Sequence, residues 1–314
     1  MIMNNAFLHP LIMLSAAIIG LAAGALFDCG WTSQLIEPFL MIMLFVVFMC
    51  VSIKDIGRSF SNFRFTSTAL LINFVWTPIF AVLLGLLFSE IDVRVGLLML
   101  LVTPCTDWYL VFTATAKGNV PLSSSLLPLN LVLQIVLMPV YLILFYNTQI
   151  SLDIPGLLWS MVVVLVIPLT ASIIVKALMP KARIMESFGN KVTGNGDELQ
   201  LFFLCLAIAV MFASQSAELL NHLDLFVMLI VPLLVFFVVN YIVATSVSKL
   251  RGFDYRDTTS LVFTSMARNS PLSLAIAVAA FPDATLLLLV LVIAPLIELP
   301  ILSITAGYRF RKAE

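Results

Sequence analysis

Two long apolar segments of this chain are each interrupted near their middle by a proline that lies close to an ionisable residue. The first interruption reads LVTPCTDW and contains Pro104 and Asp107. The second reads SMARNSP and contains Arg268 and Pro271. A charge inside a hydrocarbon layer costs about 2.5–3.5 kcal/mol on insertion scales, so such residues usually pair with each other or serve transport. Matching interruptions in the two halves of a chain indicate the binding site of a transporter.

Pro104 and Pro271 are predicted to break their helices, because proline lacks a backbone donor and clashes with the preceding turn. The freed carbonyls then need a cation, water or a neighbouring side chain. The half-helices that restart beyond the breaks direct their N-termini inward, where they favour anions. A single proline is more often a simple kink. Two in equivalent segments with polar neighbours favour a binding site.

Asp107 and Arg268 are both predicted to lie near the middle of their segments. If the two breaks cross, their side chains can form an ion pair. One interpretation is a permanent bridge between two helices. The other is functional: Arg268 supplies positive charge for an anion, or Asp107 carries a proton.

Glu298 is a third ionisable residue within an apolar segment, in the motif PLIELP. Burial disfavours the charged form of a carboxyl group, so Glu298 is a predicted proton carrier. A carboxylate satisfied by backbone donors freed by the flanking prolines is an equal alternative.

Cys105 lies at the first break, between Pro104 and Thr106. A lone cysteine in a membrane helix is usually a small packing residue. Soft metalloids prefer thiolate, however, and a helix N-terminus activates a thiol. Cys105, Thr106, Arg268, Asn269 and Ser270 are therefore the predicted substrate-binding residues.

Other polar residues within the apolar segments either line the same cavity or join helices through hydrogen bonds. They are Asn73, Thr103, Asn130, Gln134, Asn240, Thr264 and Ser265.

The composition is that of a polytopic membrane protein, with 62% hydrophobic and 11% charged residues. Soluble domains average about 25% charged residues. The net charge of −1 provides no basic field for nucleic acid. The four cysteines show no metal-binding spacing, and no metal or cofactor is expected. The sequence contains no P-loop pattern, which argues against an ATP-driven pump. It also contains no arrangement of nucleophile and base that would indicate an enzyme.

The apolar runs predict an all-α protein of ten membrane-spanning helices, since each run is close to the 20 or so residues that cross a bilayer. We expect the first run to be a retained helix. The predicted spans are residues 7–27, 36–53, 66–88, 94–116, 122–146, 156–178, 199–217, 224–247, 257–280 and 284–307.

With ten spans, 14 of the 16 Lys and Arg residues fall on one side of the membrane. Arg94 alone falls on the other side, and Arg268 lies within a span. Positive charge gathers on the cytoplasmic side, so both termini are predicted to be cytoplasmic.

Ten spans divide into two repeats of five, residues 1–150 and 151–314, which point in opposite directions across the membrane. The interrupted spans are the fourth of each repeat, which predicts that helices 4 and 9 cross at mid-membrane. The connection 180–198, which is polar and contains Gly189, Gly194 and Gly196, is predicted to be a turn-rich hinge.

These motifs resemble the bile acid:sodium symporter superfamily, and within it the arsenite efflux permeases. Four motifs carry the likeness: PCT at 104–106, KGN at 117–119, ARN with LAIAVA at 267–279, and PLIELP at 295–300. The resemblance covers nearly the whole chain. It implies a core domain of helices 3–5 and 8–10 beside a panel domain of helices 1, 2, 6 and 7. It also implies that the cysteine of the PCT motif takes part in transport.

The chain departs from both branches of this superfamily. Sodium symporters carry Glu and Gln before the ninth-helix Asn, where this chain has Thr264 and Arg268. A sodium ion there would face a fixed positive charge. Arsenite permeases carry a Glu shortly after that Asn, where this chain has none.

The sequence thus favours a secondary transporter in the plasma (inner) membrane that exports arsenite or a related small oxyanion, with protons rather than sodium as the coupling ion. The alternative is a sodium- or proton-coupled symporter of an organic anion. A channel or a structural membrane protein is a third class, which the charged helix breaks argue against.

Overall fold

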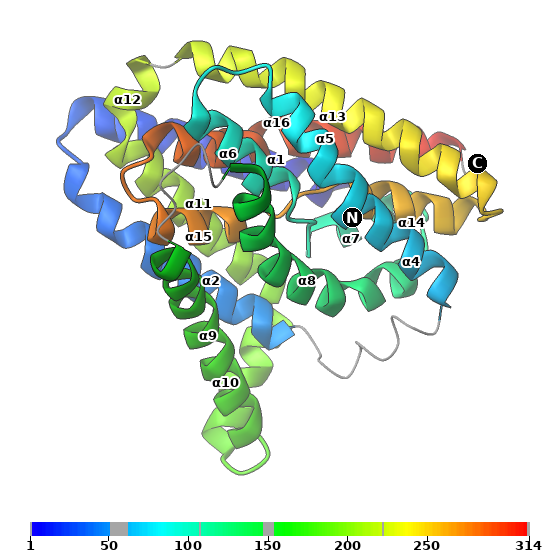
Figure 1. Ribbon diagram of the computed structural model, residues 1–314. Helices are drawn as coiled ribbons and strands as arrows, with labels where there is room; N and C mark the ends of the chain where they lie inside the picture. The colour runs from blue at the N-terminus through cyan, green and yellow to red at the C-terminus, as the bar shows by residue number, and fades with distance from the viewer. Residues whose placement is uncertain (1, 51–61, 107, 147–153, 222, 313–314) are drawn as a thin grey trace.

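The computed structural model describes residues 2–50, 62–106, 108–146, 154–221 and 223–312 (Figure 1). In these ranges every element is helical, and the one β-type pairing is an isolated bridge between Pro104 and Arg268. The protein is therefore all-α, as its apolar runs predict.

Most of the long helices lie where the apolar runs place them. In chain order the helices are α1 (Ile2–Leu26), η1 (Gly30–Leu35), α2 (Ile36–Cys50), α4 (Phe63–Leu71), the π-helical segment η4 (Ile72–Trp76), α5 (Thr77–Gly85), α6 (Ile91–Leu101), α7 (Trp108–Thr115), α8 (Val120–Tyr146), α9 (Ile154–Leu178), α10 (Arg183–Gly194), α11 (Gly196–Ser214), α12 (Ser216–Asn221), α13 (Leu223–Leu250), α14 (Tyr255–Met266), α15 (Ser270–Ala280) and α16 (Thr285–Lys312). The fourth predicted span is split into α6 and α7, and the ninth into α14 and α15.

Five helical stretches among the described residues are long and apolar enough to cross a membrane, or six if the bent pair α10–α11 forms one span. The five are Gly30–Cys50, Phe63–Gly85, Val120–Tyr146, Val227–Leu250 and Thr285–Lys312. Shorter apolar helices cover Leu11–Leu26, Val166–Leu178 and Ser270–Ala280. The chain is a multi-pass membrane protein, and the ten-span inverted repeat stays a prediction.

The prediction of a turn-rich connection over 180–198 is wrong, because most of it is the helix α10. Phe188 and Val192 are one helical turn apart: Phe188 stacks on Phe45, and Val192 packs against Val46. This apolar spacing outweighs the low helix propensity of the glycines. Helix α10 extends with α9 beyond the rest of the molecule (Figure 1).

Helices α1 and α11 pack at very short range through small residues. A Cβ added at Gly20 would lie 2.1 Å from the Ala209 carbonyl oxygen, and one at Gly24 would lie 2.1 Å from that of Ala213. The two glycines are four residues apart, so they form one face of α1. Small residues at this spacing let membrane helices approach backbone to backbone.

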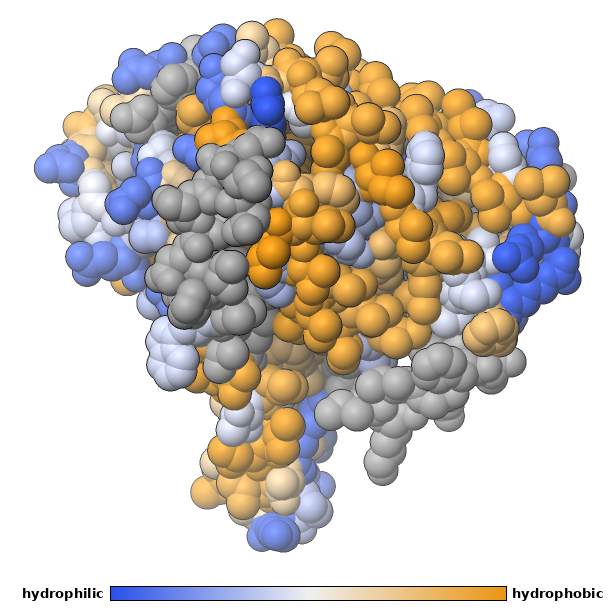
Figure 2. All heavy atoms as spheres, in the orientation of Figure 1, coloured by the Kyte–Doolittle hydropathy of each residue, from blue (hydrophilic) through white to orange (hydrophobic). Residues whose placement is uncertain are grey.

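The outer surface of the helices is apolar. Figure 2 shows a broad hydrophobic area over the middle of one face, with hydrophilic groups gathered toward the sides of the view. Exposed side chains of α13 include Val227, Val231, Val238 and Ile242. Such a surface suits contact with lipid chains rather than water.

Candidate functional site

The two interruptions predicted from the sequence lie against each other. The Cys105 amide donates to the Ala267 carbonyl oxygen at 3.0 Å, and the Asn269 amide donates to the Thr103 carbonyl oxygen at 2.7 Å. These two bonds form the antiparallel bridge between Pro104 and Arg268. The backbone groups freed by the breaks therefore satisfy one another.

Four helix ends converge at this bridge. Helix α6 ends at Leu101 and α14 ends at Met266, while α7 begins at Trp108 and α15 begins at Ser270. The site thus contains two C-termini, which favour positive charge, and two N-termini, which favour negative charge.

Pro104 lies inside its interruption, whereas Pro271 lies just after the second one, where a proline prevents α14 from continuing into α15. Pro271 lies in the first turn of α15, where its missing amide hydrogen is not needed. The second break is residues 267–269, and Asn269 caps α15 by accepting from the Leu272 amide at 3.2 Å.

Arg268 is only 3% exposed, and protein oxygens surround its guanidinium. Nη1 donates to the Leu101 carbonyl at 2.8 Å, Nε donates to the Met266 carbonyl at 3.2 Å, and Nη2 donates to the Ser265 carbonyl. Nη2 also donates to Asn73 Oδ1 at 3.2 Å. The guanidinium carbon lies 5.3 Å from the centre of the Phe236 ring.

Glu298 of α16 reaches the same residue through its backbone. Its Oε1 accepts from the Arg268 amide at 2.8 Å, and its side chain is 5% exposed. The sequence offered the alternative that backbone donors satisfy the Glu298 carboxylate. A backbone amide does donate to it, but this amide belongs to the second break and not to α16.

The remaining predicted residues also lie at the bridge. Asn269 Nδ2 donates to Thr106 Oγ1 at 3.1 Å, which joins the two breaks through side chains. Ser270 Oγ donates to the Leu291 carbonyl of α16. Cys105 is 3% exposed, and its amide forms one of the two hydrogen bonds of the bridge. Asp107 lies outside the described residues, so its ion pair with Arg268 stays a prediction.

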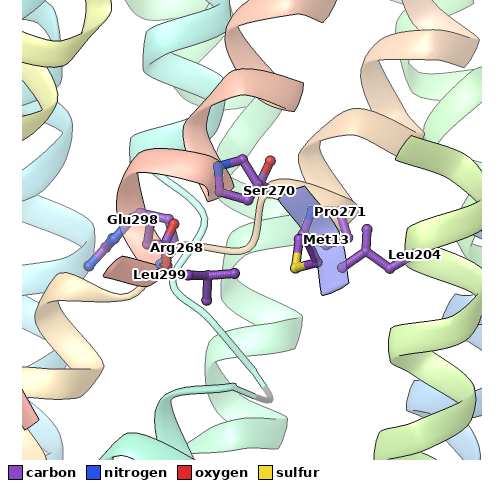
Figure 3. Close-up of a pocket in the computed structure, with 8 residues that line it drawn as sticks. Met13, Leu204, Arg268, Ser270, Pro271, Glu298 and Leu299 are labelled. Carbon is purple, nitrogen blue, oxygen red and sulfur yellow. The ribbon is translucent and has the colours of Figure 1, made fainter. Parts of the chain in front are cut away.

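Two cavities flank the bridge and share Leu204 and Pro271. The first contains about 270 Å³ of empty space, including space open to solvent, and is lined by Met13, Leu204, Arg268, Ser270, Pro271, Pro295, Glu298 and Leu299. Figure 3 shows Arg268, Glu298 and Leu299 on one side of this cavity, with Met13, Pro271 and Leu204 on the other. The second contains about 320 Å³ of empty space, counted in the same way, and is lined by Met43, Leu44, Val47, Thr106, Leu131, Gln200, Leu204, Asn269 and Pro271.

The sequence did not point to the residues that α1, α2 and α11 contribute to these cavities. Met13, Met43 and Leu204 are ordinary members of apolar runs and carry no signal. Gln200 is the exception, because it is a polar residue near the start of an apolar helix and lines the second cavity.

Helix α8 carries two buried amides that have no hydrogen-bond partner within the described residues. Asn130 and Gln134 are 0% exposed, and both polar atoms of each side chain are unpaired. The Thr264 hydroxyl is also fully buried and has no hydrogen-bond partner among the described residues. Buried polar groups normally have partners, so these side chains are suited to bind a solute, an ion or water.

Residues 37–223, more than half of the chain, match the Sodium Bile acid symporter family. The chain belongs to this family. The match, the helix breaks and the enclosed polar site describe a membrane transporter rather than an enzyme.

Two proteins are similar to this member of the Sodium Bile acid symporter family. Arsenical-resistance protein Acr3 of Corynebacterium glutamicum is 24% identical over 93% of this chain and 82% of its own length. The uncharacterized protein YbaS of Bacillus subtilis is 26% identical over 68% of this chain and 69% of its own length. The resemblance to both the symporters and the arsenical-resistance proteins is thereby confirmed.

Proposed function

We propose that this transporter exports arsenite or a related small oxyanion in exchange for protons. The observation that carries the proposal is the position of Cys105 in the first break. Thr106 of the same break lines the second cavity, and Arg268, which pairs with Pro104 across the bridge, lines the first. Similarity to an arsenical-resistance protein along most of the chain supports the same substrate class.

The substrate is placed at the bridge between the helix breaks. The Cys105 sulfur binds the arsenic, because soft thiolate ligands select soft metalloids. Thr106 and Asn269 are hydrogen-bonded to each other and offer polar groups to the oxygens of the substrate. Ser270 and Arg268 line the neighbouring cavity, which forms the other part of the path.

Proton coupling is assigned to Glu298, with Asp107 as the second carboxylate. Glu298 lines the first cavity and contacts the second break through the Arg268 amide. A change in its charge therefore acts on the backbone that holds the two breaks together. Protonation of Glu298 weakens its hold on that amide, because a charged acceptor forms the stronger hydrogen bond.

The proposal is tested with Cys105→Ser in an arsenite-sensitive host that lacks its own efflux protein. We expect the wild type to confer resistance and Cys105→Ser to abolish it, at equal amounts of protein in the membrane. The matched control is Cys205→Ser, because Cys205 lies in helix α11 and outside both helix breaks. Unchanged resistance with Cys105→Ser would remove the proposed role of this thiol.

The second proposed function is sodium- or proton-coupled uptake of an organic anion. It is favoured by the family match and by the presence of Arg268, a cation, on the wall of a cavity. The two proposals separate in one host strain. A protein that confers no arsenite resistance, yet accumulates a labelled carboxylate in vesicles, supports the second.

A further inference from the structure

We propose that the Arg268 guanidinium is a built-in cation that joins the C-terminal ends of α6 and α14, so that transport by this chain requires no sodium ion at the helix breaks. The inference concerns how the site is held together, and it does not depend on which substrate is carried.

The first step is the identity of the acceptors. The guanidinium donates to the carbonyls of Leu101, Ser265 and Met266, which are the last residue of α6 and the last two residues of α14. The last turn of a helix leaves carbonyls without an intrahelical partner, and its dipole is negative at that end. Arg268 therefore neutralises two helix C-termini at once.

The second step is the shape of this oxygen cluster. Three backbone carbonyls and Asn73 Oδ1 surround one positive charge. Carbonyl and amide oxygens are the ligands that hard metal cations take in proteins. Asn73 lies in the π-helical segment η4, and such local irregularities are frequent at functional sites. The cluster is a cation site that the chain fills with its own side chain.

The third step is the charge balance around the guanidinium. Arg268 is 3% exposed, and a charge buried this deeply is stable only when it is paired and hydrogen-bonded. The groups next to Arg268 from neighbouring helices are Asn73 of η4, the Phe236 ring of α13 and Glu298 of α16, whose carboxylate accepts from the Arg268 backbone amide. The oxygens that would hold a sodium ion already accept from the guanidinium, so a sodium ion bound there would face its positive charge.

The fourth step is the consequence for coupling. A guanidinium attached to the chain cannot leave with the substrate, whereas a bound ion can. The contact between α6 and α14 is therefore permanent and independent of the external salt. A change in the occupancy of this oxygen cluster cannot drive transport in the wild type, which leaves a carboxylate such as Glu298 as the group that moves charge.

The test begins with the purified wild-type protein in detergent. Its melting temperature is compared in sodium chloride and in choline chloride at equal ionic strength. We expect no difference, and transport in vesicles is expected to be unchanged when sodium is replaced by choline. A requirement for sodium in the wild type would overturn the proposal, even if no variant can be made.

The second arm uses Arg268→Ala, which opens the oxygen cluster. Its melting temperature in choline chloride is expected to fall by about 5 °C or more, as for other losses of buried interactions. Addition of millimolar methylguanidinium chloride is expected to restore most of this loss, and sodium chloride part of it. A purely structural arginine predicts no dependence on the added cation.

The matched control is Arg309→Ala. Arg309 is equally buried, at 3% exposed, but it contacts Thr259 and Tyr255 far along α14 from the break. This variant is expected to lose stability without any response to sodium. A folded Arg268→Ala protein that responds to neither cation would overturn the proposal.

Discussion

Arg268 makes side-chain contacts that only a guanidinium can make together. Its three nitrogens reach four oxygens in different directions, from α6, α14 and η4. An ammonium group is a single point charge with three donors on a flexible stem. The two cationic residues are therefore not interchangeable at this position.

Arg268→Lys is expected to reduce transport by at least about tenfold, because a hydrogen bond to a charged group contributes roughly 1.5–3 kcal/mol and at least one is lost. The protein is expected to remain folded, since the positive charge at the helix ends is kept. Initial transport rates in vesicles and the melting temperature of the same preparation measure the two effects. A transport rate of Arg268→Lys equal to that of the wild type would contradict the proposed need for a guanidinium at this position.

Glu298→Gln is expected to separate coupling from folding. The glutamine side-chain oxygen can still accept from the Arg268 amide, which the carboxylate contacts at 2.8 Å. Its charge, however, no longer changes with protonation. We therefore expect a melting temperature close to that of the wild type and loss of accumulation driven by a proton gradient.

The control for Glu298→Gln is Glu90→Gln, which removes an exposed carboxylate outside both cavities. Equal proton-driven accumulation by Glu298→Gln and the control would transfer the coupling role to Asp107 or to another group.

At the scale of elements, the helices were predictable and their closest contacts were not. Apolar runs of helical length predict the long membrane helices because only helices satisfy the backbone in lipid, but they do not predict α10. The partners of Arg268 are mostly main-chain carbonyls, which leave no mark in the sequence. The close contact of α1 with α11 was overlooked, although Gly20 and Gly24 show the small-residue spacing that produces it.

Gly20→Ala is expected to lower stability by about 1–3 kcal/mol, the usual cost of inserting atoms into a close-packed contact. The added Cβ would lie 2.1 Å from the Ala209 carbonyl oxygen, so α1 and α11 must separate. Gly307→Ala is the control, because a Cβ there meets nothing within 4 Å and alanine favours the helix. Thermal unfolding in detergent measures both, and equal stability would show that α1 does not depend on this contact.

Gln134→Met is expected to keep or raise stability while it lowers transport. The amide is fully buried and unpaired, and removal of an unsatisfied polar group in favour of an apolar one of similar shape is neutral or stabilising. Ser125→Ala on the same helix is the control, because that hydroxyl donates to the Leu122 carbonyl of its own helix. Lower stability of Gln134→Met would instead assign the amide to helix packing.

At the scale of the whole molecule, the described residues contain five or six helical stretches of spanning length, whereas the distribution of positive charge predicts ten spans. For two of the missing spans, the fourth and the ninth, the difference has a physical origin in the breaks. Helices α6 and α7, and likewise α14 and α15, are too short individually, since each covers about half of the bilayer. A length rule cannot count a span that consists of two half-helices separated by a break.

Both termini are expected on the cytoplasmic side. A fluorescent protein fused after residue 314 is expected to fluoresce in cells, and alkaline phosphatase fused at the same place is expected to be inactive. Single cysteines in a variant without native cysteines extend the test, with Ser33 expected to react from outside and Ser187 from inside. A reversed pattern would contradict the ten-span topology.

The bridge between the two breaks uses only main-chain atoms, those of Thr103, Cys105, Ala267 and Asn269. Its hydrogen bonds therefore survive when the side chains around it are exchanged. Such a frame lets a lineage of proteins acquire new cargo by point substitution, without rebuilding the architecture that moves it.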